Sequence, residues 1–262
     1  MKKFVVCALL VVLILSAVAC TKTEYTETVA FDKKDAKTIA HRGLSGLAVE
    51  NTDTAFILAG QHSYYGIESD VRRTKDGQFV MCHDDNLNRI AGIDMSVENS
   101  TLEELLNVPL LPKNEDSQVE HLSTLESYIL ICKQYDKQAI LELKSNFTEQ
   151  EIVQMIAIIT GLGYIHKVTF ISFGYDNLTY VRKYLPNQSV MFLFSALTDE
   201  ITAKLIADKI DVAINHKELT KKALEQFHDA GLKVNCWTVD DKAKAERLVK
   251  MGVDYITTNI LE

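Results

Sequence analysis

The chain has 262 residues, of which 47% are apolar, so it can bury the core of one large α/β domain or of two small ones. With 36 acidic and 28 basic residues its net charge is -8, which argues against whole-chain attraction to nucleic acid or to an anionic bilayer surface. Any anion that the protein binds must therefore be held by a local cluster of side chains.

The N-terminus carries the pattern of an export signal. Two lysines precede an apolar run over residues 4–15, and the small residues of "SAVAC" lead to Cys20. This stretch resembles the signal peptides of bacterial lipoproteins, although Ala-Val-Ala also fits ordinary cleavage. We expect a lipoprotein-type signal peptide over residues 1–20, a lipid on Cys20, and a polar tether over residues 21–37. The protein would then sit in the cell envelope, on the periplasmic or surface side of a bacterial membrane, and contact the membrane only through this anchor.

Short β-rich runs alternate with helical patterns along the rest of the chain. Many of the helical patterns open on Ser, Thr or Asp, and several close on Gly. Such alternation is typical of parallel βα units, so residues 38–262 predict a single α/β domain, a (β/α)8 TIM barrel. An open doubly wound sheet is the alternative, but no Gly-x-Gly-x-x-Gly follows the first strand. The predicted strands are residues 38–41, 67–71, 139–143, 168–172, 190–194, 212–215, 234–237 and 255–258.

Two departures from this rhythm follow the second strand. Lys75-Asp76-Gly77 is a turn signal between the run that ends near residue 73 and the run over residues 79–82, which predicts a hairpin. Residues 92–121 then contain turns, acidic residues and two prolines. We interpret them as a short insertion at the barrel mouth, before the third barrel strand.

Polar side chains gather where the predicted strands end, and in a barrel these ends converge on one mouth. Glu68 and Asp70 are two residues apart on one strand, so both point to the same face. Glu142 and Lys144 repeat this spacing on the next barrel strand. A single pair of this kind is more often a solvated edge, but inward carboxylates on two strands would be costly without a partner. Three carboxylates and no thiolate predict a site for one hard divalent cation, Ca²⁺ or Mg²⁺.

Two histidines are expected to flank this acidic site. His41 ends the first strand, next to Arg42. Pairing across the predicted hairpin places His83 opposite roughly residue 70, so it returns to the neighbourhood of Asp70. A lone histidine is usually structural, but two beside one acidic site suggest an acid and base pair that works near neutral pH.

Four further residues are secondary candidates. Glu50 and Asn51 follow the first strand and could order its loop and support Arg42, or they could cap the helix that follows. Trp237 lies on a late strand near the mouth, where it could form an apolar wall or simply fill the core. Phe173 is a weaker candidate for the same wall.

The ordered fragments of the chain resemble one enzyme family, the glycerophosphodiester phosphodiesterases. The similarity covers about residues 38–259 and implies a barrel, a divalent metal, and hydrolysis of a phosphodiester that bears a glycerol. It carries over to His41, Arg42, Glu68, Asp70, His83, Glu142 and Lys144. The fragments are "AHRG", "ENT", "GIESDV", "TKDG", "TLEELL", "LSTLES", "LELK", "ISF", "VNCWTVD" and "GVDYITTN".

A mechanism follows from this resemblance as a hypothesis. The three carboxylates would hold the cation, and Arg42 and Lys144 would hold phosphate oxygens. His41 would take a proton from the glycerol 2-hydroxyl or from water, and His83 would give one to the departing alcohol. The order in which the two histidines act stays open, and a cyclic phosphate intermediate is one route.

The function expected from these residues is hydrolysis of deacylated phospholipids to glycerol 3-phosphate and an alcohol. Close alternatives are a lysophospholipase D-like activity and hydrolysis of glycerophosphate polymers of an envelope. A barrel that binds phosphate esters without turnover, or a structural lipoprotein, would not need paired imidazoles or inward carboxylates. The partner is thus a small phosphodiester, while the sequence sets neither its head group nor the oligomeric state.

Overall fold

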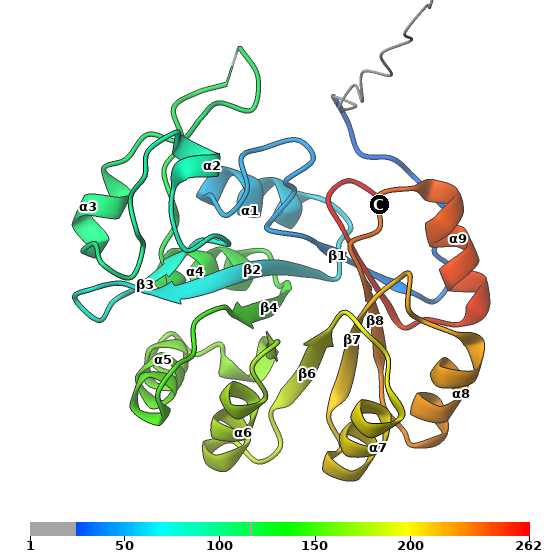
Figure 1. Cartoon of the computed structure of the whole chain (residues 1–262). Helices are drawn as coiled ribbons and strands as arrows, with labels where there is room; N and C mark the ends of the chain where they lie inside the picture. Colours follow the sequence, from blue (N-terminus) through cyan, green and yellow to red (C-terminus); the bar gives the residue numbers. More distant parts are fainter. Residues whose placement is uncertain (1–24, 116) are drawn as a thin grey trace, which may run out of the picture.

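The computed structural model describes residues 25–115 and 117–262, and in them eight parallel strands close into a barrel (Figure 1). Pairing runs from β1 through β9, β8, β7, β6, β5, β4 and β2 back to β1. The predicted barrel is confirmed, and each predicted strand agrees with the observed one to within two residues at either end. The strands are β1 (Lys37–Ala40), β2 (Gly66–Arg73), β4 (Gln138–Leu143), β5 (Val168–Ser172), β6 (Ser189–Phe194), β7 (Asp211–Asn215), β8 (Val234–Trp237) and β9 (Tyr255–Thr258).

Helices cover the outside of the barrel, and most of them begin at a residue that caps their N-terminus. A helix leaves its first backbone N–H groups without partners, and a Thr or Asp side-chain oxygen accepts one of them. Thr52, Thr124, Thr148, Thr198, Thr220 and Asp241 do so here. The helices are α1 (Asp53–Gln61), α4 (Leu125–Gln134), α5 (Glu149–Gly161), α6 (Tyr175–Tyr184), α7 (Asp199–Asp208), α8 (Lys221–Asp229) and α9 (Lys242–Met251), with a 3₁₀ turn at Ile165–Lys167 before β5.

The predicted hairpin follows β2. Strand β3 (Phe79–Met81) runs antiparallel to β2, with Val71 opposite Met81. Gly77 takes a positive φ of 74° in the turn, a conformation that glycine adopts without steric cost. The pairing continues past β3, because the Cys82 N–H donates to the Asp70 carbonyl over 2.8 Å. The chain therefore returns to the mouth of the barrel one residue before His83.

The insertion after the hairpin folds around a small core of its own. It begins before residue 92, where the sequence predicted its start, and contains two short helices, α2 (Asn88–Ala91) and α3 (Leu102–Leu106), which lie apart from the ring of helices around the barrel (Figure 1). The apolar side chains that pack together here are Val80, Cys82, Leu87, Ile90, Val97, Leu105, Val108, Leu110 and Leu122. These residues form a cluster separate from the barrel interior, in which the insertion packs against the hairpin through Val80 and Cys82.

The segment before β1 lies against the end of the chain. Val29 pairs with Leu261, and its N–H donates to the Ile260 carbonyl over 3.0 Å. Phe31 is buried. Part of the segment predicted as a polar tether thus contributes apolar contacts to the barrel. The predicted signal peptide and Cys20 lie outside the described residues. Among the helices of the described ranges, none is both long and apolar enough to cross a membrane.

Successive side chains of each strand point alternately into and out of the barrel, and the inward ones fill its interior. An apolar cluster inside it contains Ile39, Ile140, Ile171, Met191, Leu193 and Ala213. On β4, Ile140 belongs to this cluster, and Glu142, two residues further toward the mouth, shares its face. The interior along β4 therefore changes from apolar to acidic toward the C-terminal end, where the mouth of the barrel lies.

Candidate active site

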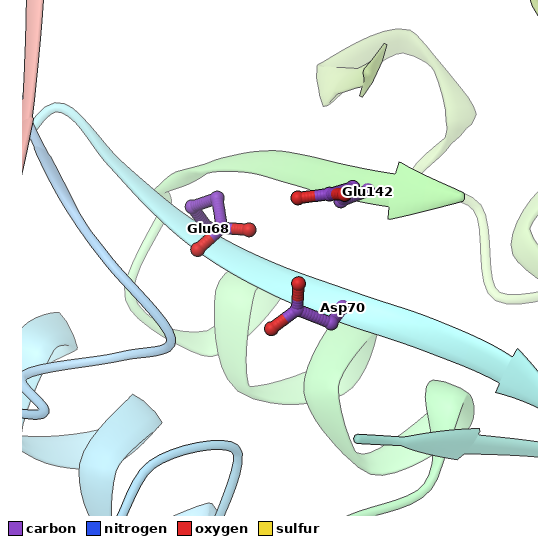
Figure 2. A group of neighbouring side chains, drawn as sticks. All are labelled: Glu68, Asp70 and Glu142. Carbon is purple, nitrogen blue, oxygen red and sulfur yellow. The ribbon is translucent and has the colours of Figure 1, made fainter. Parts of the chain in front are cut away.

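The three predicted carboxylates meet at the mouth of the barrel. Glu68 and Asp70 lie on the same face of β2, and Glu142 lies opposite Asp70 on β4. Figure 2 shows all three side chains turned toward one another from these two strands. One carboxylate oxygen from each lies within 4.8 Å of the others. Glu68, Asp70 and Glu142 are 2%, 0% and 8% exposed, so water screens this cluster poorly.

Burial and mutual repulsion give the three acids different pKa values. Burial, together with the charge of Asp70, raises the pKa of Glu68 well above its usual value and that of Glu142 to about 7. Burial acts in the same direction on Asp70, but Arg42, His83 and Lys144 lower its pKa overall. Without a cation, and below about pH 7, the site holds its negative charge mainly on Asp70 and its protons on the two glutamates.

The donor set fits a divalent cation. Asp70 Oδ1 is buried and accepts no hydrogen bond, and Lys144 Nζ lies 3.8 Å from it. A buried carboxylate oxygen without a partner is costly. Oxygen ligands from three carboxylates suit Ca²⁺ or Mg²⁺, and a cation there would satisfy Asp70 Oδ1 and favour the ionised form of both glutamates.

A tight turn fixes Arg42 beside the acids. Arg42 and Gly43 have positive φ angles of 55° and 76°. A Cβ on Gly43 would lie 2.7 Å from the backbone of Ala55, so both the φ angle and the space require glycine. This turn points the Arg42 N–H at Glu68 Oε2 over 2.8 Å. The Arg-Gly pair therefore ties the first loop directly to a predicted cation ligand.

Two cationic side chains lie over the acidic cluster. Arg42 NH1 donates to Glu50 Oε1 over 2.8 Å, and Arg42 Nε lies 3.5 Å from Asp70 Oδ2 without a hydrogen bond. Lys144 Nζ lies 2.9 Å from Glu142 Oε1. The buried Nε of Arg42 thus keeps one N–H for an acceptor that enters the site.

His41 is held in one orientation by residues that the sequence did not single out. Its Nδ1 lies 2.7 Å from Asn259 Oδ1. Asn259 donates its amide to Asp240 Oδ2 over 2.6 Å, so its oxygen must face His41 and Ser45, which donates to it as well. Nδ1 therefore carries the proton and Nε2 has the free lone pair. Burial and the adjacent Arg42 lower the pKa of His41 to about 4, which keeps the ring neutral and able to accept a proton.

His83 is oriented by a carboxylate instead. Its Nδ1 donates to Asp84 Oδ1 over 2.6 Å, because a carboxylate can only accept. Arg89 Nε donates to the other oxygen, Asp84 Oδ2, over 2.6 Å. Burial lowers the pKa of His83, and the Asp84 contact opposes that effect. Like His41, His83 leaves Nε2 for the site.

Both secondary candidates from the first loop take the supporting role rather than the helix-capping role that the sequence left open. Thr52, not Asn51, is the N-cap of α1. Asn51 is buried, accepts from Ser69 Oγ over 2.7 Å and donates to Asp70 Oδ2 over 2.9 Å. Glu50 contacts Arg42, as described above. Both residues therefore support the charged groups of the site.

The aromatic candidates lie next to Lys144. The rings of Phe173 and Trp237 meet edge to face with centroids 5.7 Å apart, and Lys144 Nζ lies 5.9 Å from the Phe173 ring centroid. Phe173 is 46% exposed, whereas Trp237 is partly buried with an indole N–H that has no partner. The pair gives the mouth a short apolar wall with one unused donor.

In metal-free protein, Glu142 should destabilise the fold as the pH rises from about 4.5 to 7. The pKa of Glu142 is about 7 in the folded chain, against a usual value of 4.5. The folded state therefore binds the Glu142 proton more tightly than the unfolded state, and the stability that this gives is complete below pH 4.5 and lost as the pH passes 7. We expect urea unfolding in chelator to show a Glu142→Gln variant gaining roughly 3 kcal/mol over wild type across this interval. The variant also removes the Glu142 charge that helps to raise the pKa of Glu68, so the pH-dependent difference reports these two coupled glutamates together. A difference that is independent of pH would contradict the assignment.

Comparison with known proteins agrees with the resemblance drawn from the sequence. Residues 41–262 match the profile of the glycerophosphoryl diester phosphodiesterase family. The chain is 30% identical to a glycerophosphodiester phosphodiesterase of Caldanaerobacter subterraneus subsp. tengcongensis over 225 residues, which cover 84% of this chain and 93% of that protein.

Two solved structures share the fold along nearly their whole length. One is an Oleispira antarctica phosphodiesterase in complex with the product sn-glycerol-3-phosphate, with a TM-score of 0.80, 28% identity, and coverage of 85% of this chain and 92% of that one. The other is a glycerophosphodiester phosphodiesterase of Parabacteroides distasonis, with a TM-score of 0.72, 26% identity, and coverage of 86% and 93%. The chain belongs to the glycerophosphoryl diester phosphodiesterase family.

Proposed function

We propose that the protein is a metal-dependent phosphodiesterase that hydrolyses glycerophosphodiesters to sn-glycerol 3-phosphate and an alcohol. The observation that carries this proposal is the convergence of three buried carboxylates, two cationic side chains and two oriented imidazoles on one barrel mouth. The similarity to the Oleispira antarctica phosphodiesterase, solved with sn-glycerol-3-phosphate, supports the same product.

Glu68, Asp70 and Glu142 would hold one divalent cation, Ca²⁺ or Mg²⁺. When bound, it supplies a Lewis acid that polarises a phosphate oxygen and lowers the pKa of a nearby hydroxyl. The fit rests on the unpartnered Asp70 Oδ1 and on the two glutamates whose pKa values are raised in the absence of a positive charge.

Arg42 and Lys144 would bind the remaining phosphate oxygens. The planar guanidinium of Arg42 keeps its Nε–H free of any hydrogen bond, and it can donate to a non-bridging oxygen. Lys144 sits between the acids and Phe173, so its ammonium can reach the same phosphate while the aromatic wall covers the glycerol carbons. Binding the diester in this way excludes water from one side of the phosphorus.

Proton transfer would then be divided between the two histidines. His41 Nε2 takes the proton of the attacking glycerol 2-hydroxyl or water, the new P–O bond forms, and the P–O bond to the alcohol breaks. His83 enters this step as the imidazolium, protonated on both ring nitrogens, and gives its Nε2 proton to the departing alkoxide while Nδ1 keeps the proton that it donates to Asp84. If the 2-hydroxyl attacks, the cyclic phosphate that results is opened by water with the two roles reversed. The hydrogen bonds to Asn259 and Asp84 keep both Nε2 atoms available for these transfers.

Two grooves beside the site differ in chemistry and separate the candidate substrates. A groove of about 300 Å³ includes Lys144 and is lined by polar residues: Arg72, Arg73, Asp85, Glu98, Ser145, Asn146 and Glu151. A groove of about 280 Å³ has a mixed lining, in which apolar residues such as Leu47, Val49, Ile90 and Leu111 alternate with polar ones that include Glu50 and Arg89. The groove that shares Lys144 with the site favours a small polar alcohol over an acyl chain.

A coupled assay for sn-glycerol 3-phosphate tests the proposal. We expect the purified protein to release it from glycerophosphocholine and glycerophosphoethanolamine, and chelator to abolish the release until Ca²⁺ or Mg²⁺ is restored. A glycerophosphate polymer serves as a competing substrate in the same assay, and lysophosphatidylcholine in a parallel assay for released choline, because its other product keeps the acyl chain. Turnover of only one of these two competing substrates would change the substrate class. Tight binding of diesters with no turnover of any of them would contradict the enzyme.

A further inference from the structure

Arg89 joins two carboxylates that belong to different parts of the chain. It lies on α2, at the start of the insertion. Its NH1 and NH2 donate to Glu50 Oε2 and Oε1 over 2.8 and 2.7 Å, and its Nε donates to Asp84 Oδ2 over 2.6 Å. Three donors of one guanidinium are therefore used on three carboxylate oxygens, the planar arrangement for which arginine is suited and lysine is not.

Each of these carboxylates also accepts a hydrogen bond from a residue of the proposed mechanism. Glu50 Oε1 also accepts from Arg42 NH1 over 2.8 Å, and Asp84 Oδ1 accepts from His83 Nδ1 over 2.6 Å. The contacts form one continuous series: Arg42, Glu50, Arg89, Asp84, His83. Within this series, Arg89 alone contacts both Glu50 and Asp84. It therefore links the side of the mouth that would bind phosphate to the side that the alcohol would leave.

The charge balance shows what Arg89 does for Arg42. The Glu50 carboxylate is shared between two guanidinium groups, and its side chain is only 18% exposed. Removal of Arg89 would leave this poorly hydrated charge with Arg42 as its sole cationic partner in the series. Glu50 would then compete with the substrate phosphate for the Arg42 guanidinium. An exposed arginine usually contributes little, but one with two hydrogen bonds to a part-buried carboxylate is an exception.

We propose that Arg89 is a positioning residue for this reaction: it neutralises Glu50, so that Arg42 stays available to phosphate, and it fixes Asp84, so that His83 keeps its proton on Nδ1. The inference rests on the proposed function for its catalytic consequence. Its structural content, however, concerns phosphate binding and the tautomer of a histidine, and both can be measured without turnover.

The binding of sn-glycerol 3-phosphate tests the first half. With calorimetry in Ca²⁺ or Mg²⁺, Arg89→Gln should weaken binding by about 10- to 100-fold, the same range by which loss of a group that orients a metal ligand weakens metal binding. The double variant Glu50→Gln/Arg89→Gln should recover most of that loss, because no competing carboxylate is left for Arg42. Arg89→Lys should fall between wild type and Arg89→Gln. Arg247→Gln, which changes an exposed arginine on α9, is the matched control and should bind like wild type.

Recovery in the double variant is the deciding result, since it is the opposite of what a direct phosphate contact or a merely structural arginine would give. If Arg89→Gln binds like wild type, or if the double variant binds as weakly as Arg89→Gln, the first half is overturned. Unfolding midpoints of all variants are compared, and Arg89→Lys keeps the test valid if Arg89→Gln unfolds.

The ¹⁵N resonances of the His83 ring, assigned with a His83→Gln variant, test the second half. In wild type the resonances should show that the neutral ring carries its proton on Nδ1. In Arg89→Gln a substantial fraction of the molecules should carry that proton on Nε2 instead, and kcat should be lower. An unchanged tautomer would overturn the claim for His83. If wild type turns over no diester, the proposed function fails on its own, while the binding and NMR results still decide the role of Arg89.

Discussion

Replacing His41 by alanine should lower kcat for glycerophosphocholine by about 10²- to 10⁴-fold, the range that a positioned general base contributes. The imidazole is neutral because burial lowers its pKa to about 4, and the Asn259 contact leaves Nε2 as the only site that can accept a proton. KM should change much less than kcat, since the phosphate is held by other side chains. Steady-state kinetics at saturating cation measure both.

The control for this variant is another histidine of the same chain. His166 is exposed and lies within the 3₁₀ turn Ile165–Lys167 between α5 and β5, so His166→Ala should keep wild-type kinetics. Both variants should unfold cooperatively within a few degrees of wild type. If His41→Ala keeps more than about a tenth of the wild-type kcat while it remains folded, His41 is not the base and the division of roles in the mechanism is wrong.

Changing Glu68 to glutamine should remove activity and at the same time stabilise the metal-free protein. Burial and two neighbouring carboxylates raise the pKa of Glu68 well above its usual value, so its ionised form is unfavourable near pH 8 when no cation is present. Glutamine keeps the oxygen that accepts from the Arg42 N–H and removes the charge. Activity should fall at least about 100-fold, because a ligand of the proposed cation is lost.

Thermal unfolding with and without Ca²⁺ separates these two effects. In chelator the Glu68→Gln variant should melt above wild type. Saturating Ca²⁺ should stabilise wild type by about 2.7 kcal/mol at one hundred times its dissociation constant, and the variant by much less. Glu225→Gln on α8, which removes an exposed carboxylate, should behave as wild type in both conditions. Equal stabilisation of Glu68→Gln and wild type by the cation would show that the ion binds elsewhere.

The sequence predicted the barrel and the acidic cluster because both depend on local spacing. Runs of buried strand residues recur between helical patterns, and two acids at i, i+2 must share a face of the strand that carries them. The hairpin could be predicted for the same reason, since a Lys-Asp-Gly turn fixes which residues pair across it. His83 was placed beside Asp70 by that register alone.

The residues that hold the site groups in place could not be predicted in this way. Asn259 reaches His41 from β9, the last strand, and Asp240 fixes Asn259 from the loop after β8. Both lie at strand ends that face the mouth, so the rule that identified His41 could have included them, but only the closed barrel brings the first and last strands together. Arg89 was missed because its two partners depend on how the insertion packs, which no periodicity encodes.

The position of the cation tests the whole account most directly. Crystals of the protein loaded with Mn²⁺, which substitutes for Ca²⁺ or Mg²⁺ at oxygen sites, should give one strong anomalous peak with an oxygen from each of Glu68, Asp70 and Glu142 about 2.0 to 2.6 Å away. A peak at other acidic residues, in a protein whose diester hydrolysis still requires the metal, would contradict the site proposed here.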